Sequence, residues 1–298
     1  QFAAGDGGLV RIGDVAKIDR DGAHVPVREQ VGRGGFHPAP RAVPVAHAQA
    51  RHHRVGQRLG EGLGHLPPLK AIARALQHNG AKVAFALREP EAARAALAEL
   101  GAQIVQAPYW PTPAPPALAS GSYADILAGN GYGSTADICK MIGAWDGVID
   151  AVLPDLVVCE HAPGAALSAF GRIPVAFVGN GFAVPPCDGA IFPPFETGKG
   201  DAARQEPVQA ALQEALATLR RQEPRSICEP FRGVFRGVYS FPLFDTYRDV
   251  RRDAVLGPIE PLPALTALPA SRRMFAYSAS NNPAVDQLTQ GLMDLGSQ

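Results

Sequence analysis

Apolar and polar positions alternate along residues 59–180 in a way that predicts strands and helices in turn. Continuous short apolar runs are typical of buried strands, and apolar residues spaced three and four apart are typical of helices. The predicted strands are residues 82–87, 103–106, 155–159 and 174–178. The predicted helices are residues 66–78, 90–100, 123–152 with a break near 129–134, and 162–170. This alternation predicts an α/β fold with a parallel sheet that is covered by helices on both faces.

The first 58 residues lack this pattern. They contain one leucine, Leu9, and five of the eight histidines, and their nine basic residues exceed their five acidic ones. Their short apolar pairs, such as Leu9-Val10, do not extend to a strand of normal length. We therefore expect residues 1–58 to be a disordered or irregular segment.

The last part of the sequence predicts the first elements of a second domain. A long helix is expected near residues 206–222, and the proline-rich sequence of residues 251–270 predicts an extended linker. A strand at 273–278 and a helix at 283–295 follow. Because one strand and one helix cannot bury their own faces, we expect a first domain at residues 59–250 and the start of a truncated second domain at 271–298.

The amino-acid composition disfavours several classes of function. The 28 basic and 28 acidic side chains cancel, which disfavours a protein that binds nucleic acid by neutralising phosphates. No apolar run reaches the roughly 18 residues of a membrane-spanning helix, and no secretory signal is visible, so we expect a cytoplasmic protein. Four widely spaced cysteines predict reduced thiols without a zinc site: Cys139, Cys159, Cys187 and Cys228.

Three segments, in the same order, resemble the UDP-glycosyltransferase type of GT-B glycosyltransferases. The first is LGEGLGHLPPLKAIARALQHNGAKVAFALRE, the second PDLVVCEHAPGAALSAFGRIPVAFVGNGF, and the third FPLFDTYRDVRRDAVLGPIEPLP. The positions that match or nearly match the family's first pattern are Gly62, Gly64, His65, Pro68, Leu69, Ala73, Leu76, Gly80, Val83 and Phe85. The likeness covers about residues 59–280 and implies that the sheet is the Rossmann-like, acceptor-binding N-terminal half of a GT-B fold.

The resemblance implies a base and its partner. Glycosyl transfer needs an acceptor hydroxyl whose proton is removed, and an imidazole is suited to this near neutral pH. The family's base is the His of its G-H motif, which is His65 here, and the orienting acid follows the D-L-V-V strand, where this chain has Glu160. The family usually has Asp at that place, and Glu is one methylene longer. Because sites in parallel sheets lie at the carboxyl ends of strands, His65 and Glu160 could share one crevice.

Other residues of these segments have both a functional and a structural interpretation. Gly62 and Gly64 would let the backbone bend and the substrate approach. Asn180 and Gly181, in GNGF, would line the acceptor cleft or form a plain turn. Trp110 would stack on a flat or hydrophobic acceptor or pack within its loop. His161 could take a role beside Glu160, although alternation along a strand would point it elsewhere.

Nucleotide-binding fingerprints are incomplete. The glycines of residues 60–64 lack the spacing and the preceding strand of a dinucleotide-binding motif, and no P-loop sequence exists. We therefore expect no cofactor and no metal, with a nucleotide-sugar as the co-substrate of the full-length family.

The chain departs from the family pattern at both ends. The family has a strand directly before the glycine-rich turn, where this chain has RHHRVGQR, whose basic groups a central strand cannot bury without partners. We hypothesise that residues 1–58 are not native to the fold and derive from a shifted reading frame. No H-G-G-like donor motif follows the linker, so groups that stabilise a leaving diphosphate are expected to be absent.

The sequence thus predicts a glycosyltransferase-like protein, incomplete as given. It would transfer a hexosyl group from a nucleotide-sugar donor to a small hydrophobic or lipid acceptor, by an inverting, metal-independent route. The alternative is a non-catalytic acceptor-binding module that complements a separate donor-domain chain. A related GT-B enzyme, such as a nucleotide-sugar epimerase, is a third interpretation.

Overall fold

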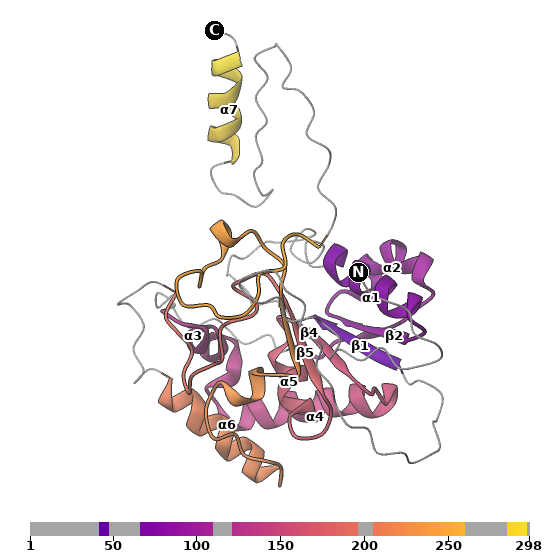
Figure 1. Ribbon diagram of the computed structural model, residues 1–298, viewed down its shortest axis with the longest axis vertical. Helices are drawn as coiled ribbons and strands as arrows, with labels where there is room; N and C mark the ends of the chain where they lie inside the picture. Colours follow the sequence, from indigo (N-terminus) through magenta and orange to yellow (C-terminus); the bar gives the residue numbers. More distant parts are fainter. Residues whose placement is uncertain (1–41, 48–65, 110–120, 196–204, 260–284, 297–298) are drawn as a thin grey trace, which may run out of the picture.

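A parallel sheet forms the centre of the molecule (Figure 1). The computed structural model describes residues 42–47, 66–109, 121–195, 205–259 and 285–296. Within these residues the sheet has six strands in the order β3-β2-β1-β4-β5-β6, and every pairing is parallel. The strands are β1 (Ala42–His47), β2 (Lys82–Leu87), β3 (Gln103–Gln106), β4 (Val157–Glu160), β5 (Val175–Gly179) and β6 (Phe235–Val238). This is the strand order of a doubly wound, Rossmann-like fold.

Strand β1 corrects the expectation that residues 1–58 are irregular throughout. It lies between β2 and β4, with Val43 in register with Val83 and Val45 in register with both Phe85 and Val158. Pro44 stands inside the strand, and proline cannot donate to a ladder, so it argues against a central strand when the sequence is read alone. The other residues of the 1–58 segment lie outside the described part of the chain.

Helices cover both faces of the sheet. The helices are α1 (Leu66–His78), α2 (Pro90–Leu97), α3 (Tyr123–Leu127), α4 (Thr135–Val152), α5 (Pro163–Ala169), α6 (Glu206–Thr218) and α7 (Val285–Gly296). Residues of α1 and α2 form one apolar cluster with Val158 and Val178 of the sheet. Residues of α3 to α6 form a second, larger cluster with Val157 and Phe177. Successive residues of β4 and β5 therefore point to opposite helical layers, as the pleat of a strand requires.

Most predicted elements are confirmed. The break expected in residues 123–152 is a π-helical turn, η4 (Ala128–Tyr132), where Gly131 has a φ of 92°. Strand β6 was not predicted, because FRGV contains an arginine and a glycine and forms no apolar run. The predicted strand at 273–278 lies outside the described residues. All four cysteines are free thiols.

The start of the predicted linker packs against the first domain. Val255 forms a parallel bridge with Val238, and the Arg251 side chain is only 2% exposed. Residues 251–255 are thus part of the domain. Beyond the linker, α7 stands apart from the sheet in Figure 1, and its residues 286–291 are exposed.

Helices α4 and α5 approach each other closely because α5 is built from small residues. A Cβ at Gly164 of α5 would lie 2.6 Å from Nε1 of Trp145 and 2.9 Å from Cγ of Met141. Trp145 is buried in the larger cluster and cannot move without opening it. Glycine at position 164 is therefore a packing requirement.

We predict that Gly164→Ala destabilises the protein by roughly 1–3 kcal/mol, because overpacking outweighs the gain in helix propensity. Gly143→Ala, on the exposed side of α4 with no atom within 4 Å of the new Cβ, is the matched control. It should stabilise by about 0.5–1 kcal/mol. Urea unfolding of both variants measures the difference, and equal effects at the two glycines would contradict the packing account.

Candidate functional site at the carboxyl edge of the sheet

Strands β4, β5 and β6 end side by side, and this edge carries the candidate site. Cys159 is in register with Phe177, and Gly179 is in register with Val238. The amide of Tyr239, the residue after β6, donates to the carbonyl of Gly179 with an N–O distance of 2.9 Å. The carboxyl ends of three strands are therefore fixed next to one another by backbone hydrogen bonds.

Glu160 is the last residue of β4 and is fully buried, with an exposed fraction of 0%. The hydroxyl of Tyr239 donates to its Oε1 atom at 3.1 Å. A carboxylate removed from water needs such donors, since burial of an uncompensated charge costs several kcal/mol. The pair brings together residues that are 79 positions apart in the sequence.

The Glu160 carboxylate also raises the pKa of the tyrosine that donates to it. Burial raises the pKa of the Tyr239 hydroxyl above its ordinary value, and the negative charge of Glu160 and the hydrogen bond to it raise that pKa further. Tyr239 therefore stays protonated near neutral pH and acts as a donor to Glu160.

Gly179 packs closely against the loop that follows β5 and lies next to Glu160. Gly179 lies on β5, between β4 and β6. A Cβ at this position would lie 2.8 Å from Cβ of Ala183 and 3.6 Å from Oε1 of Glu160. A larger side chain here would meet the following loop and crowd the carboxylate.

Some of the predicted site residues lie outside the part of the chain that the structure describes. His65, Gly62, Gly64 and Trp110 lie outside the described residues. Leu66 opens α1, and because α1 leads to a strand parallel to β1, it must begin at the edge where the strands end. That is the edge to which Glu160 belongs, and the meeting of His65 with Glu160 stays a prediction.

A second histidine position occurs at this edge. His47, the last residue of β1, is the Cα register partner of Glu160. The sequence analysis placed His47 in the irregular segment, and only the pairing of β1 with β4 relates it to Glu160.

Asn180 and Gly181 build the turn that follows β5. Oδ1 of Asn180 accepts a hydrogen bond from the amide of Ala183 at 2.9 Å, and its carbonyl accepts one from Val184 at 3.2 Å. A Cβ at Gly181 would lie 2.0 Å from Oδ1 of Asp245, so glycine is required there for packing. The turn interpretation accounts for these contacts, and the substrate-binding role of both residues stays a prediction.

His161 lies on the opposite side of the sheet from Glu160, as strand alternation predicted. It has a φ of 48°, in the left-handed region, and is 8% exposed. Its ring centroid is 6.1 Å from that of Tyr123 in α3 and 5.8 Å from that of Phe182. The ring thus packs among aromatic rings of the α3 to α6 layer.

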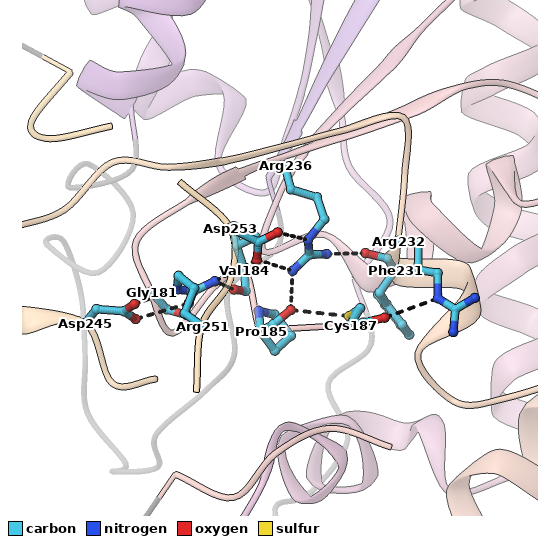
Figure 2. Close-up of polar contacts among 10 residues, drawn as sticks. All are labelled: Gly181, Val184, Pro185, Cys187, Phe231, Arg232, Arg236, Asp245, Arg251 and Asp253. Carbon is cyan, nitrogen blue, oxygen red and sulfur yellow. Dashed lines mark hydrogen bonds and ion pairs between the residues drawn. The ribbon is translucent and has the colours of Figure 1, made fainter. Parts of the chain in front are cut away.

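Three arginines hold the loop after β5 (Figure 2). Arg251 donates to the carbonyls of Gly181 at 2.8 Å and Val184 at 2.9 Å. Arg236 donates to the carbonyl of Pro185, and Arg232 to that of Cys187 at 3.1 Å. The loop has no strand partner for these carbonyls, so guanidinium groups take the place of a backbone ladder.

Two aspartates form ion pairs with Arg251 and Arg236. Arg251 forms an ion pair with Asp245, and the two side chains are 2% and 1% exposed. Asp253 contacts both Arg251, at 3.1 Å, and Arg236, at 3.2 Å. We name these five residues, Arg232, Arg236, Asp245, Arg251 and Asp253, the arginine clamp.

Sequence analysis missed the clamp and Tyr239. The clamp residues fall in a stretch assigned to a domain end and a linker, where arginines and aspartates alternate as they would on a solvated surface. Tyr239 follows a strand that has no apolar run. Only the pairing of β6 with β5 places Tyr239 and the arginine clamp at the candidate site.

Comparison with protein-family models and with curated proteins finds no match. Among solved structures, a glycosyltransferase of kitacinnamycin is 18% identical, with a TM-score of 0.44 over 82% of this chain and 56% of that one. SnogD from Streptomyces nogalater is 16% identical, with a TM-score of 0.40 over 77% of this chain and 54% of that one. SsfS6 from Streptomyces sp. SF2575 is 14% identical, with a TM-score of 0.39 over 68% and 51%.

These three structures are glycosyltransferases by name. The matched part of this chain spans about half the length of each of them, between 51% and 56%. At these identities the similarity concerns the fold alone. In the part of the chain that the structure describes, no helix has the length and apolar character to cross a membrane.

We predict that Arg251→Met destabilises the protein by about 3–5 kcal/mol, because it leaves the Asp245 carboxylate buried without its partner. Arg248→Met is the control, since the Arg248 side chain is 56% exposed and its ion pair with Asp249 lies at the surface. That variant should stay within about 0.5 kcal/mol of wild type. Urea unfolding compares the two, and a mild Arg251→Met would show that the clamp is not needed for the fold.

We predict that Tyr247→Phe stabilises the protein at neutral pH by about 1 kcal/mol, because the Tyr247 hydroxyl is buried and has no hydrogen-bond partner in the described structure. Burial raises the pKa of this hydroxyl, so the folded state keeps a proton that the unfolded state loses above about pH 10. The free energy of unfolding therefore does not depend on the titration of this group below about pH 10, and it falls as the pH rises above that value.

The free energy of unfolding of Tyr247→Phe should consequently fall less steeply above about pH 10 than that of wild type, by roughly 1.4 kcal/mol per pH unit. Urea melts of both proteins between about pH 9 and 11 provide the comparison, and parallel pH profiles would contradict the burial of an ionisable hydroxyl.

Proposed function

We propose that this chain is the acceptor-binding half of a glycosyltransferase of the UDP-glycosyltransferase type. The observation that carries the proposal is a fully buried carboxylate, Glu160, that ends the parallel strand next to β1 and is held by the Tyr239 hydroxyl. Buried ionisable side chains concentrate at functional sites, which supports this assignment. The position agrees with the sequence resemblance, which selected the same residue from the D-L-V-V segment.

In the proposed reaction His65 removes the proton of an acceptor hydroxyl as that oxygen attacks the anomeric carbon of a hexosyl donor. The nucleoside diphosphate leaves with the bonding electrons, and the configuration at the anomeric carbon inverts. The carboxylate of Glu160 orients the imidazole and stabilises the imidazolium that forms, as the aspartate of a Ser-His-Asp triad does. No metal ion takes part in this scheme.

The acceptor in this proposal is a small hydrophobic or lipid molecule, and the donor is a nucleotide-sugar. The sequence carries no H-G-G-like donor motif, and the chain spans about half the length of similar glycosyltransferases. Stabilisation of the leaving diphosphate is an electrostatic effect, and this proposal assigns no residue of the acceptor-binding half to it. The chain is therefore proposed to bind acceptor and to transfer sugar slowly or not at all.

We predict that phenolic or lipid acceptors change the tryptophan fluorescence of the chain saturably, while UDP release from UDP-sugars is slow or absent. Any release should be lost in His65→Ala and Glu160→Gln, since both remove a group that acts on the acceptor proton. Asp155→Asn, at the exposed turn before β4, is the control and should keep the wild-type rate.

A parallel His47→Ala variant distinguishes the two histidine positions of this edge. Loss of release in His47→Ala with retention in His65→Ala would overturn the choice of base. Absence of acceptor binding would overturn the proposed function itself.

A further inference from the structure

We propose that Tyr239 is a positioning residue that fixes the carboxylate of Glu160 in one orientation at the carboxyl edge of the sheet. This inference rests on the proposed function, in which Glu160 orients the base. It goes beyond that function by assigning a residue of β6's end to the site, from the contacts and the packing described below.

A backbone hydrogen bond fixes the position of the main chain at Tyr239. Its amide donates to the carbonyl of Gly179 at 2.9 Å, directly after β6 pairs with β5. The Tyr239 side chain is half-buried and packs against the apolar cluster of the α1 and α2 layer, which contains Val158 and Val178. A ring that is held at its backbone and along its side has few orientations, so its hydroxyl is a pre-organised donor.

The path from Tyr239 to Glu160 crosses β5. The two residues stand on β4 and beyond β6, and β5 lies between these strands. Gly179 lies beside this contact, since a Cβ there would be at van der Waals distance, 3.6 Å, from Oε1 of Glu160. A long side chain at position 179 would therefore compete with the Tyr239 ring for the space next to the carboxylate.

Glu160 needs a positioning partner because its side chain is long. A glutamate carboxylate is separated from the backbone by two methylene groups and loses rotamer freedom when it is fixed. The Tyr239 hydroxyl donates to Oε1 at 3.1 Å, which restrains the position of that oxygen. Glu160→Asp would draw the carboxylate back by about 1.5 Å, one carbon–carbon bond, and break this contact.

A carboxyl-labelled glutamate NMR titration tests the proposal without requiring activity. The ¹³C signal of the Glu160 carboxyl, assigned by its loss in Glu160→Gln, is followed against pH in wild type and in Tyr239→Phe. Loss of a donor to the charged form should move the midpoint of that signal upward by about one pH unit. Tyr247→Phe, which removes a buried hydroxyl without a partner in the described structure, is the matched control and should leave the midpoint in place.

A midpoint that is unchanged in Tyr239→Phe would overturn the proposal, and so would an equal movement in Tyr247→Phe. Glu160→Asp provides a second measurement: Tyr239→Phe should raise the equilibrium constant for unfolding about tenfold in wild type and leave it unchanged in the Glu160→Asp background. Additive effects would contradict the contact.

The UDP-release assay separates this inference from the function on which it rests. If wild type releases UDP, Tyr239→Phe should lower kcat about tenfold and leave the acceptor KM unchanged, because a positioning group acts after binding. A change in KM alone would assign Tyr239 to acceptor binding and overturn the positioning role. If wild type binds no acceptor, the proposed function fails, and the titration still decides whether Tyr239 fixes Glu160.

Discussion

The parallel register of β4, β5 and β6 is the constraint on which the candidate site depends. Parallel strands end at the same edge, so Glu160, Gly179 and Tyr239 become neighbours although they are far apart in the sequence. The hydrogen bonds of the ladder hold this edge, and the apolar residues of both helical layers hold the ladder. A shift of β6 by one residue would turn Tyr239 to the other face and leave the Glu160 carboxylate without its hydroxyl donor.

The arginine clamp supplies hydrogen-bond donors to the loop after β5, at the same edge of the sheet. The loop after β5 leaves the sheet and must satisfy its carbonyls without a strand partner. Arg251, Arg236 and Arg232 supply donors, and Asp245 and Asp253 pair with the guanidinium groups of Arg251 and Arg236. Buried ion pairs contribute little net stability but are costly to break, so this network favours one loop conformation over alternatives. The turn at Asn180 and Gly181 is fixed next to Glu160 as a result.

Much of the fold was readable from local patterns, and the exceptions have physical causes. Helix α1 and strands β2 and β3 have the predicted bounds, because each has apolar residues at its core-facing positions and a glycine or proline close by in the sequence. Strand β1 was missed because Pro44 interrupts it, and β6 because it carries Arg236 and Gly237. Both strands exist because neighbouring strands supply partners, which no local pattern records.

The sequence by itself determined the alternating α/β architecture, since apolar periodicity is a local property, and its resemblance to a known family singled out Glu160. The tertiary structure alone decided what surrounds that carboxylate. The Tyr239 hydroxyl, the absence of a side chain at Gly179 and the register position of His47 all come from pairings between strands distant in sequence. The same holds for the clamp, because a buried arginine and an exposed one look alike in a sequence, and only packing decides which is removed from water.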